Sequence, residues 1–213
     1  MMIVKSTPRV IVPAAGFGKR MGSPESKEML VNPRTGVPLI EATLQMSESR
    51  GWSVHVITRA DKPSLIEYLE GRAGVSVQKI GPTREWPETV LNSCDHWVGE
   101  NILILPDTEF EPSGILDSIA GSLSAGAPLA AAVFEVSKPA VWGLIRASDG
   151  QTEFCEKPAE AAGAKAWGVL GFSPGIGREL FTKILESSFD HEWKRVEARA
   201  EFFELSGFTD LTR

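Results

Sequence analysis

The chain has 213 residues, 42% of them hydrophobic and 23% charged, which is ordinary for one compact domain that buries its own core. Its formal net charge of -6 argues against a dedicated nucleic-acid binder, because any field that attracts polyanions has to be local. No signal peptide, no membrane-spanning apolar run and no CxxC spacing between its two cysteines are evident, so we expect a cytoplasmic protein without a disulfide framework.

Short β-branched runs alternate with longer amphipathic stretches, which is the pattern of parallel strands joined by crossover helices. The predicted strands are at residues 10–13, 53–58, 75–80, 101–106, 129–136, 143–147, 152–155, 167–172 and 201–205. The predicted helices are at residues 39–50, 63–71, 87–98 and 113–124, with two more between residues 172 and 201. We therefore expect a single α/β domain over residues 1–213. It should be Rossmann-like, with a mostly parallel central sheet flanked by helices and a subregion of shorter strands at about 130–175.

A glycine-rich segment, PAAGFGKRM at residues 13–21, follows the first predicted strand directly. Gly16 and Gly18 can adopt backbone angles closed to other residues and let main-chain amides approach phosphate oxygens. Lys19 and Arg20 add positive charge, and an arginine can grip two phosphate oxygens at once. The segment lacks the spacing of a P-loop and the third glycine of a dinucleotide fingerprint. Taken alone, it also fits a strand-to-helix turn with a solvated basic tip.

Residues 10–30, VIVPAAGFGKRMGSPESKEML, closely resemble the signature of the sugar nucleotidyltransferases, in the form found in bacterial UTP:glucose-1-phosphate uridylyltransferases. In that family an apolar strand is followed by AAGxGTRM, a spacer and PKEML. The resemblance implies a GT-A-like nucleotidyltransferase domain in which Arg20 and Lys27 hold a triphosphate and stabilise the departing pyrophosphate. The residues that it implies at the nucleotide are Ala14, Ala15, Gly16, Gly18 and Lys19, with Lys19 at the usual threonine position.

Two aspartates are candidate Mg²⁺ ligands. Asp107 follows the apolar strand predicted at 101–106, and ligands of open α/β sheets bind outside the carboxyl ends of strands. Its segment LPDT resembles the strand-end aspartate of the family, a magnesium ligand, although aspartate also commonly caps a turn. Asp210, in GFTDLTR, resembles the late W-x-D-[ILV]-G-T segment, with Phe208 for tryptophan and no closing glycine; a solvated aspartate is the alternative. Mg²⁺ that bridges phosphates usually needs only one or two protein carboxylates.

The acceptor side is predicted from three segments in order: VSKPAVWGLI, EKP and AWGVLGFSPGI. They resemble the acceptor region of the family, in which the glutamate of EKP bonds sugar hydroxyls and the lysine meets the phosphate of the sugar 1-phosphate. The resemblance therefore implies that Gly143, Glu156 and Lys157 bind this substrate. Taken alone, EKP is a solvated turn in most proteins. The acceptor-side subregion would span about 130–175.

The segment GPTREWPETVLNS, which begins at Gly81 and includes Thr89, lacks the glutamine and the GTA-like turn that precede the fourth helix in the family. The nucleobase therefore cannot be read from the sequence. The resemblance also leaves the oligomeric state open.

The resulting hypothesis is a metal-dependent enzyme that uses Mg²⁺ to transfer a nucleoside monophosphate from a nucleoside triphosphate to a sugar 1-phosphate. It would release pyrophosphate and form a nucleotide sugar. Such chemistry depends on alignment and charge neutralisation more than on a protein nucleophile. One alternative is a cytidylyltransferase that acts on a non-sugar phosphate such as phosphocholine or a polyol phosphate. Another is a degenerate, non-catalytic nucleotide-binding regulatory protein. A nicotinamide-dependent dehydrogenase is disfavoured by the missing third glycine.

Overall fold

The computed structural model describes residues 7–16, 26–161 and 163–211. Its strands are β1 (Arg9–Pro13), β2 (Ser53–Arg59), β3 (Val75–Ile80), β4 (Asn101–Ile104), β5 (Thr108–Glu111), β6 (Leu129–Phe134), β7 (Gly143–Ser148), β8 (Gln151–Glu156), β9 (Lys165–Phe172), β10 (Lys194–Val196), β11 (Ala200–Glu204) and β12 (Gly207–Asp210). Its helices are α1 (Ile40–Glu48), α2 (Pro63–Leu69), α3 (Trp86–Leu91), α4 (Ile115–Ser124) and α5 (Pro174–Asp190), and the 3-10 helix η1 spans Lys27–Met29.

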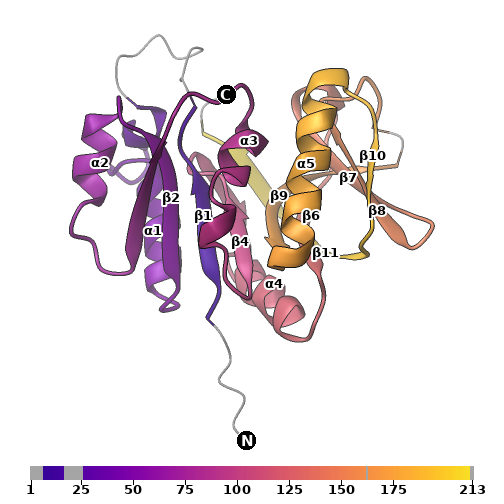
Figure 1. The fold of residues 1–213 in the computed structure, drawn as a ribbon, viewed down its shortest axis with the longest axis horizontal. Coiled ribbons are helices and arrows are strands. Elements are labelled where there is room, and N and C mark those ends of the chain that lie inside the picture. Colours follow the sequence, from indigo (N-terminus) through magenta and orange to yellow (C-terminus); the bar gives the residue numbers. More distant parts are fainter. Residues whose placement is uncertain (1–6, 17–25, 162, 212–213) are drawn as a thin grey trace, which may run out of the picture.

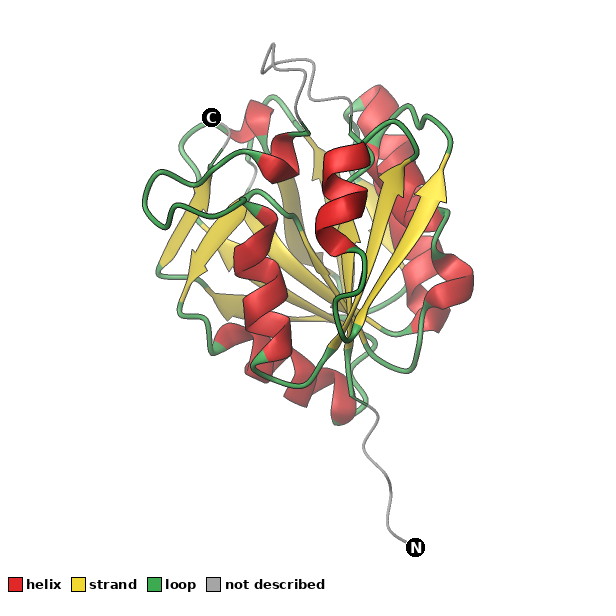
Figure 2. Cartoon of the chain, turned by 90° about the vertical axis from the view of Figure 1, so that its left-hand side faces the viewer, coloured by secondary structure: helices red, strands yellow, loops and turns green. Residues whose placement is uncertain are grey.

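A ten-stranded sheet forms the centre of the described chain (Figure 1). Its main path runs β10-β8-β7-β9-β4-β1-β2-β3, with β6 beside β9 and β11 beside β6. The neighbours β3, β2, β1 and β4 are parallel, as are β6 and β11, whereas β9 runs antiparallel to both β4 and β6. The structure thereby confirms the predicted α/β class, in which helices connect and flank the parallel strands at the centre of the sheet (Figure 2).

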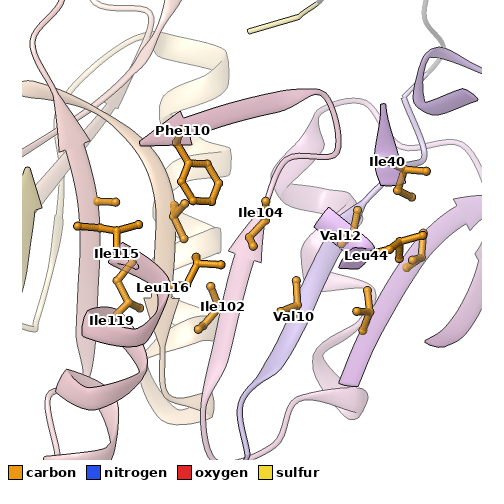
Figure 3. Packing of buried hydrophobic residues seen from close by; sticks show 14 of the residues in the cluster. Val10, Val12, Ile40, Leu44, Ile102, Ile104, Phe110, Ile115, Leu116 and Ile119 are labelled. Carbon is orange, nitrogen blue, oxygen red and sulfur yellow. The ribbon is translucent and has the colours of Figure 1, made fainter. Parts of the chain in front are cut away.

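Helices cover both faces of the sheet (Figure 2). Val10 and Val12 of β1 belong to a buried cluster with side chains of α1, α2 and α4, whereas Ile11 belongs to a second cluster with side chains of α3 and α5. Figure 3 shows Val10 and Val12 between Leu44 of α1 and Leu116 of α4. A strand that is buried on both faces needs apolar residues at consecutive positions, which explains the run VIV. None of the helices in the described ranges is long and apolar enough to cross a membrane.

The helix predicted at 87–98 is shorter in the structure, where α3 ends at Leu91. Asn92 donates a side-chain hydrogen bond to the Glu88 carbonyl oxygen, and the Ser93 hydroxyl donates to the Val90 carbonyl oxygen. Polar side chains that bond to nearby backbone groups compete with helix propagation, so they offer the chain another way to satisfy these carbonyls. The predicted extension to residue 98 was therefore wrong.

The prediction of two helices between residues 172 and 201 was also wrong. One long helix, α5, fills the first part of this stretch, and it ends where His191 adopts a left-handed backbone conformation with φ of 57°. The chain then forms β10, which pairs antiparallel with β8. A three-residue strand carries too short a pattern to be recognised without its partner, and the sequence reading therefore assigned this part to a helix.

Candidate active site

The glycine-rich segment predicted to bind nucleotide begins where β1 ends. Ala14 and Ala15 are buried, and the Ala14 amide donates a 2.7 Å hydrogen bond to the Ile57 carbonyl oxygen of β2. Gly16 is exposed, and among the described residues nothing lies within 4 Å of the place where its Cβ atom would stand. Three further predicted nucleotide contacts lie outside the described residues: Gly18, Lys19 and Arg20.

Lys27 and Asp107 are brought together as an ion pair. Lys27 is the first residue of η1 and Asp107 follows β4, and Nζ of Lys27 lies 2.8 Å from Oδ2 of Asp107. Burial by itself lowers the pKa of Lys27, but the combined attraction of the Asp107, Glu28 and Asp210 carboxylates outweighs it and raises this pKa above its ordinary value. The pair therefore places a full positive charge beside a buried carboxylate at the C-terminal end of a central strand.

Asp210 lies next to this pair because β12 pairs antiparallel with β5. The register places Asp210 opposite Thr108, and the Leu211 amide donates a 2.9 Å hydrogen bond to the Asp107 carbonyl oxygen. Asp210 also contributes to the raised pKa of Lys27. Neither β5 nor β12 was predicted from the sequence, yet this two-stranded sheet is what unites the two aspartates.

Phe208 anchors the strand that carries Asp210. Its ring stacks on Phe134 with 4.2 Å between centroids and 13° between planes, and it lies 5.6 Å from the Trp142 ring in an edge-on arrangement. A Cβ atom at Gly168 would lie 2.6 Å from Cε2 of Phe208, so that glycine leaves the space that the ring occupies. Alternate residues of a strand share a face, so the packing of Phe208 also sets the side of β12 from which Asp210 projects.

Asp107 and Asp210, which we call the aspartate cluster, offer oxygen ligands of the kind that suit a magnesium ion. Asp107 and Asp210 supply two carboxylates, the number that Mg²⁺ commonly takes from a protein when phosphate oxygens and waters complete its coordination. In the described part of the chain, Nζ of Lys27 provides the positive charge that balances Asp107. No group of three or more His, Cys, Asp or Glu side chains in the described ranges is placed to hold a metal.

The predicted acceptor residues Gly143 and Glu156 face each other as partners in the β7–β8 pairing. A Cβ atom at Gly143 would press against Oε1 of Glu156 and lie 2.5 Å from Nε1 of Trp167, so only glycine fits here. Lys157 is exposed just after β8, and its amide donates a 2.9 Å hydrogen bond to the Trp142 carbonyl oxygen. Its left-handed backbone, with φ of 53°, turns the chain away from the strand at this point.

Glu156 lies in an environment that disfavours its charged form. Its residue is 6% exposed, and burial raises the pKa of its carboxyl group to about 7, against opposing effects of the Lys157 charge and a hydrogen bond from the Trp86 side chain. Trp86 belongs to the segment GPTREWPETVLNS, which departs from the family pattern for the nucleobase. Its ring lies 5.3 Å from that of Trp167. Within the described residues, Nε1 of Trp167 is buried without a hydrogen-bond partner. The altered segment thus contributes directly to the surroundings of Glu156, a predicted acceptor residue.

Trp142 and Phe208 connect the aspartate cluster to the predicted acceptor residues. Trp142 directly precedes Gly143, Phe208 lies on the same strand as Asp210, and the two rings are in contact. The residues predicted for the metal and for the acceptor therefore belong to neighbouring parts of one structure.

Several solved structures share this arrangement of elements. A protein from Bacillus anthracis assigned as a glucose-1-phosphate thymidylyltransferase, solved with sucrose, is 13% identical and superposes with a TM-score of 0.75 over 97% of this chain and 90% of its own. A UDP-glucose pyrophosphorylase complexed with UDP-glucose is 17% identical, with a TM-score of 0.73 over 98% of this chain and 94% of that chain. The UTP-bound enzyme of this type from Acinetobacter baumannii is 16% identical, with a TM-score of 0.70 over 97% of this chain and 89% of that chain.

The chain has the fold of the sugar nucleotidyltransferases. No protein-family model matches the sequence, and a search of curated proteins finds no significant match either.

Within this nucleotidyltransferase fold, the sequence reading missed a buried ion pair beside the glycine-rich segment. Nζ of Lys62 lies 2.9 Å from Oε2 of Glu28 and donates a 2.7 Å hydrogen bond to the Ala14 carbonyl oxygen. Glu28 lies within the segment SKEML, which resembles the family signature, so the sequence could have marked it as a candidate site residue. Lys62 lies in a turn before α2 and belongs to no motif, and only the structure reveals its position.

Proposed function

We propose that this chain is a metal-dependent nucleotidyltransferase that transfers a nucleoside monophosphate from a nucleoside triphosphate to a sugar 1-phosphate, releasing pyrophosphate. The observation that carries the proposal is the Lys27–Asp107 ion pair at the C-terminal end of β4, with Asp210 beside it. A cation and two carboxylates at this edge of an α/β sheet suit a triphosphate and its counter-ion.

In the proposed reaction, an oxygen of the acceptor phosphate attacks the α-phosphorus in line with the leaving group. A new P–O bond forms to the acceptor, the bond between the α- and β-phosphates breaks, and its electron pair leaves with pyrophosphate. Lys27 and Arg20 would neutralise the negative charge that develops on the departing group. The main chain around Ala15 and Gly16 would hold the nucleotide in place. Positioning and charge stabilisation of this kind provide most of the catalysis in phosphoryl transfer.

Asp107 and Asp210 would hold the magnesium ion. When bound, Mg²⁺ neutralises phosphate charge and helps to align the reacting groups. The two carboxylates support this assignment, because Mg²⁺ prefers oxygen ligands and usually takes only one or two carboxylates from the protein.

Glu156, Lys157 and Gly143 would bind the acceptor. Lys157 is exposed and can meet a phosphate, while the buried Glu156 can exchange hydrogen bonds with hydroxyl groups in either protonation state. The similar pyrophosphorylase structures with bound UDP-glucose and UTP support a nucleotide and a sugar phosphate as the substrates.

The test is pyrophosphate release by the purified protein, with each nucleoside triphosphate offered together with a panel of phosphates in the presence of Mg²⁺. We expect turnover with at least one pair of triphosphate and sugar 1-phosphate. A preference for phosphocholine or a polyol phosphate over every sugar phosphate would instead identify the cytidylyltransferase alternative. Nucleotide binding by calorimetry without turnover for any acceptor would identify a non-catalytic regulatory protein.

A further inference from the structure

Lys62 is a buried cation at the C-terminal ends of β1 and β2. Its residue is 9% exposed, and Glu28, its partner in the ion pair, is 0% exposed. Its ammonium group donates to two acceptors, Oε2 of Glu28 at 2.9 Å and the Ala14 carbonyl oxygen at 2.7 Å. The side chain therefore bridges two segments that lie 34 and 48 residues away along the chain.

Stability alone is a poor reason for this arrangement. Burial lowers the pKa of Lys62, and the nearby charges of Lys27 and Arg59 act in the same direction, whereas Glu28 opposes them. Removing two charges from water costs about as much as their attraction returns, so buried ion pairs are often no more stabilising than apolar residues of the same size. The contacts that Lys62 makes point to a role in placing other groups.

Those contacts reach both sides of the proposed nucleotide site. Ala14 directly follows β1 and belongs to the glycine-rich segment, and its carbonyl oxygen also accepts a 3.3 Å hydrogen bond from the Thr58 hydroxyl. Glu28 is the central residue of η1 and directly follows Lys27. Displacing Glu28 would therefore displace the backbone from which Lys27 reaches Asp107.

We propose that Lys62 is a positioning residue, whose bridge from the Ala14 carbonyl to Glu28 sets the position of Lys27 beside Asp107. The proposal rests on the proposed function for its catalytic consequence. The ammonium group of Lys62 acts through the backbone of η1, and Lys27 carries the effect to the phosphates.

The kinetic test combines Lys62→Met with Lys27→Ala. We expect Lys62→Met to lower kcat roughly 10- to 100-fold, because small misplacements of catalytic groups have effects of this size. In the Lys27→Ala background the same substitution should cost only about 2-fold more, since residues that act through one another are not additive. Equal losses in both backgrounds would overturn the proposal. Lys183→Met is the matched control, because it removes a surface lysine of α5 whose partner is Glu186, one turn away.

A second measurement needs no turnover. The ammonium groups of ion-paired lysines give signals in ¹⁵N correlation spectra, and the Lys27 signal is assigned by its loss in Lys27→Ala. We expect this signal to be lost in Lys62→Met and kept in Lys183→Met. Its persistence in Lys62→Met would overturn the proposal. If the unchanged protein shows no turnover with any acceptor, the proposed function fails, while this spectrum still decides whether Lys62 places Lys27.

Lys62→Met leaves the Glu28 carboxylate buried without its cation, and that variant can fail to fold. The double substitution Lys62→Met with Glu28→Gln removes both charges and carries the same test, because it also removes the bridge. We expect the same fall in kcat and the same loss of the Lys27 signal. An unchanged kcat and spectrum in the folded double variant would show that the bridge positions nothing.

Discussion

The buried carboxyl group of Glu156 predicts an unusual dependence of stability on pH. Its pKa is raised from 4.5 to about 7 in the folded protein, mainly by burial. Below pH 4.5 the group is protonated in both the folded and the unfolded chain and has no effect. Between pH 4.5 and about 7 the unfolded chain releases the proton more readily, so the free energy of unfolding falls as the pH rises. At roughly 1.4 kcal/mol for each pH unit, the loss amounts to about 3 kcal/mol once the pH exceeds 7.

Glu156→Gln removes this titration while it keeps an oxygen that can accept the hydrogen bond from Trp86. We therefore expect its free energy of unfolding, relative to the unchanged protein, to rise by about 3 kcal/mol between pH 4.5 and pH 8. Denaturant unfolding at several pH values measures the difference. Turnover should fall even where stability rises, because the carboxyl group is a proposed acceptor contact.

Glu153→Gln is the matched control on the same strand. Burial raises the pKa of Glu153, but the hydrogen bonds and the charges of Arg146 and Arg195 together outweigh burial and lower this pKa overall. The stability that Glu153 contributes is present at neutral pH and is lost as the pH falls through its lowered pKa, so the control should respond to pH in the opposite direction. If Glu156→Gln changed stability equally at pH 5 and pH 8, the argument from burial would be refuted.

Three further predictions concern the site. Asp107→Asn should lower kcat roughly 10²-fold or more without loss of fold, because it removes a proposed Mg²⁺ ligand rather than a core group. Asp117→Asn, whose carboxylate pairs with Arg50 on the surface, should leave turnover unchanged, and equal rates for the two variants would place the site elsewhere. Gly143→Ala should lower the free energy of unfolding by about 1–3 kcal/mol through overpacking. Gly121→Ala, in an open position on α4, should not lower the free energy of unfolding. Thermal denaturation of both variants measures the difference. Chelation by EDTA should abolish pyrophosphate release, and added Mg²⁺ should restore it; full activity in EDTA would contradict the metal assignment.

Most of the main sheet and its helices could be predicted because their patterns are local. The run NILI of β4 is buried at every position and apolar after Asn101, and α1 presents Ile40 and Leu44 to the core at helical spacing. The failures have a common cause. Strands β5 and β12 have four residues each and exist because they pair with one another, so neither carries an independent signal.

Part of the candidate site could be predicted because some of its motifs are also local. Lys27 and Asp107 belong to motifs that can be read locally, and their 2.8 Å contact agrees with the expected neighbourhood. Asp210 was a weaker candidate because its motif is incomplete, and its place beside Asp107 depends on the unpredicted β5–β12 pairing. Trp167 lies in the segment AWGVLGFSPGI but was not among the predicted site residues, and its buried indole group lies beside Gly143.

The sequence by itself determined the α/β class, the order of the main elements and the residue types that point to phosphate chemistry, because periodicity and motif spacing are properties of short segments. The tertiary structure alone decided which charges meet. The bridge from Lys62 to Glu28 and Ala14, and the displaced pKa of Glu156, depend on burial and on distances between residues that are far apart in the chain. These quantities arise only when the sheet is assembled and water is removed from its edge.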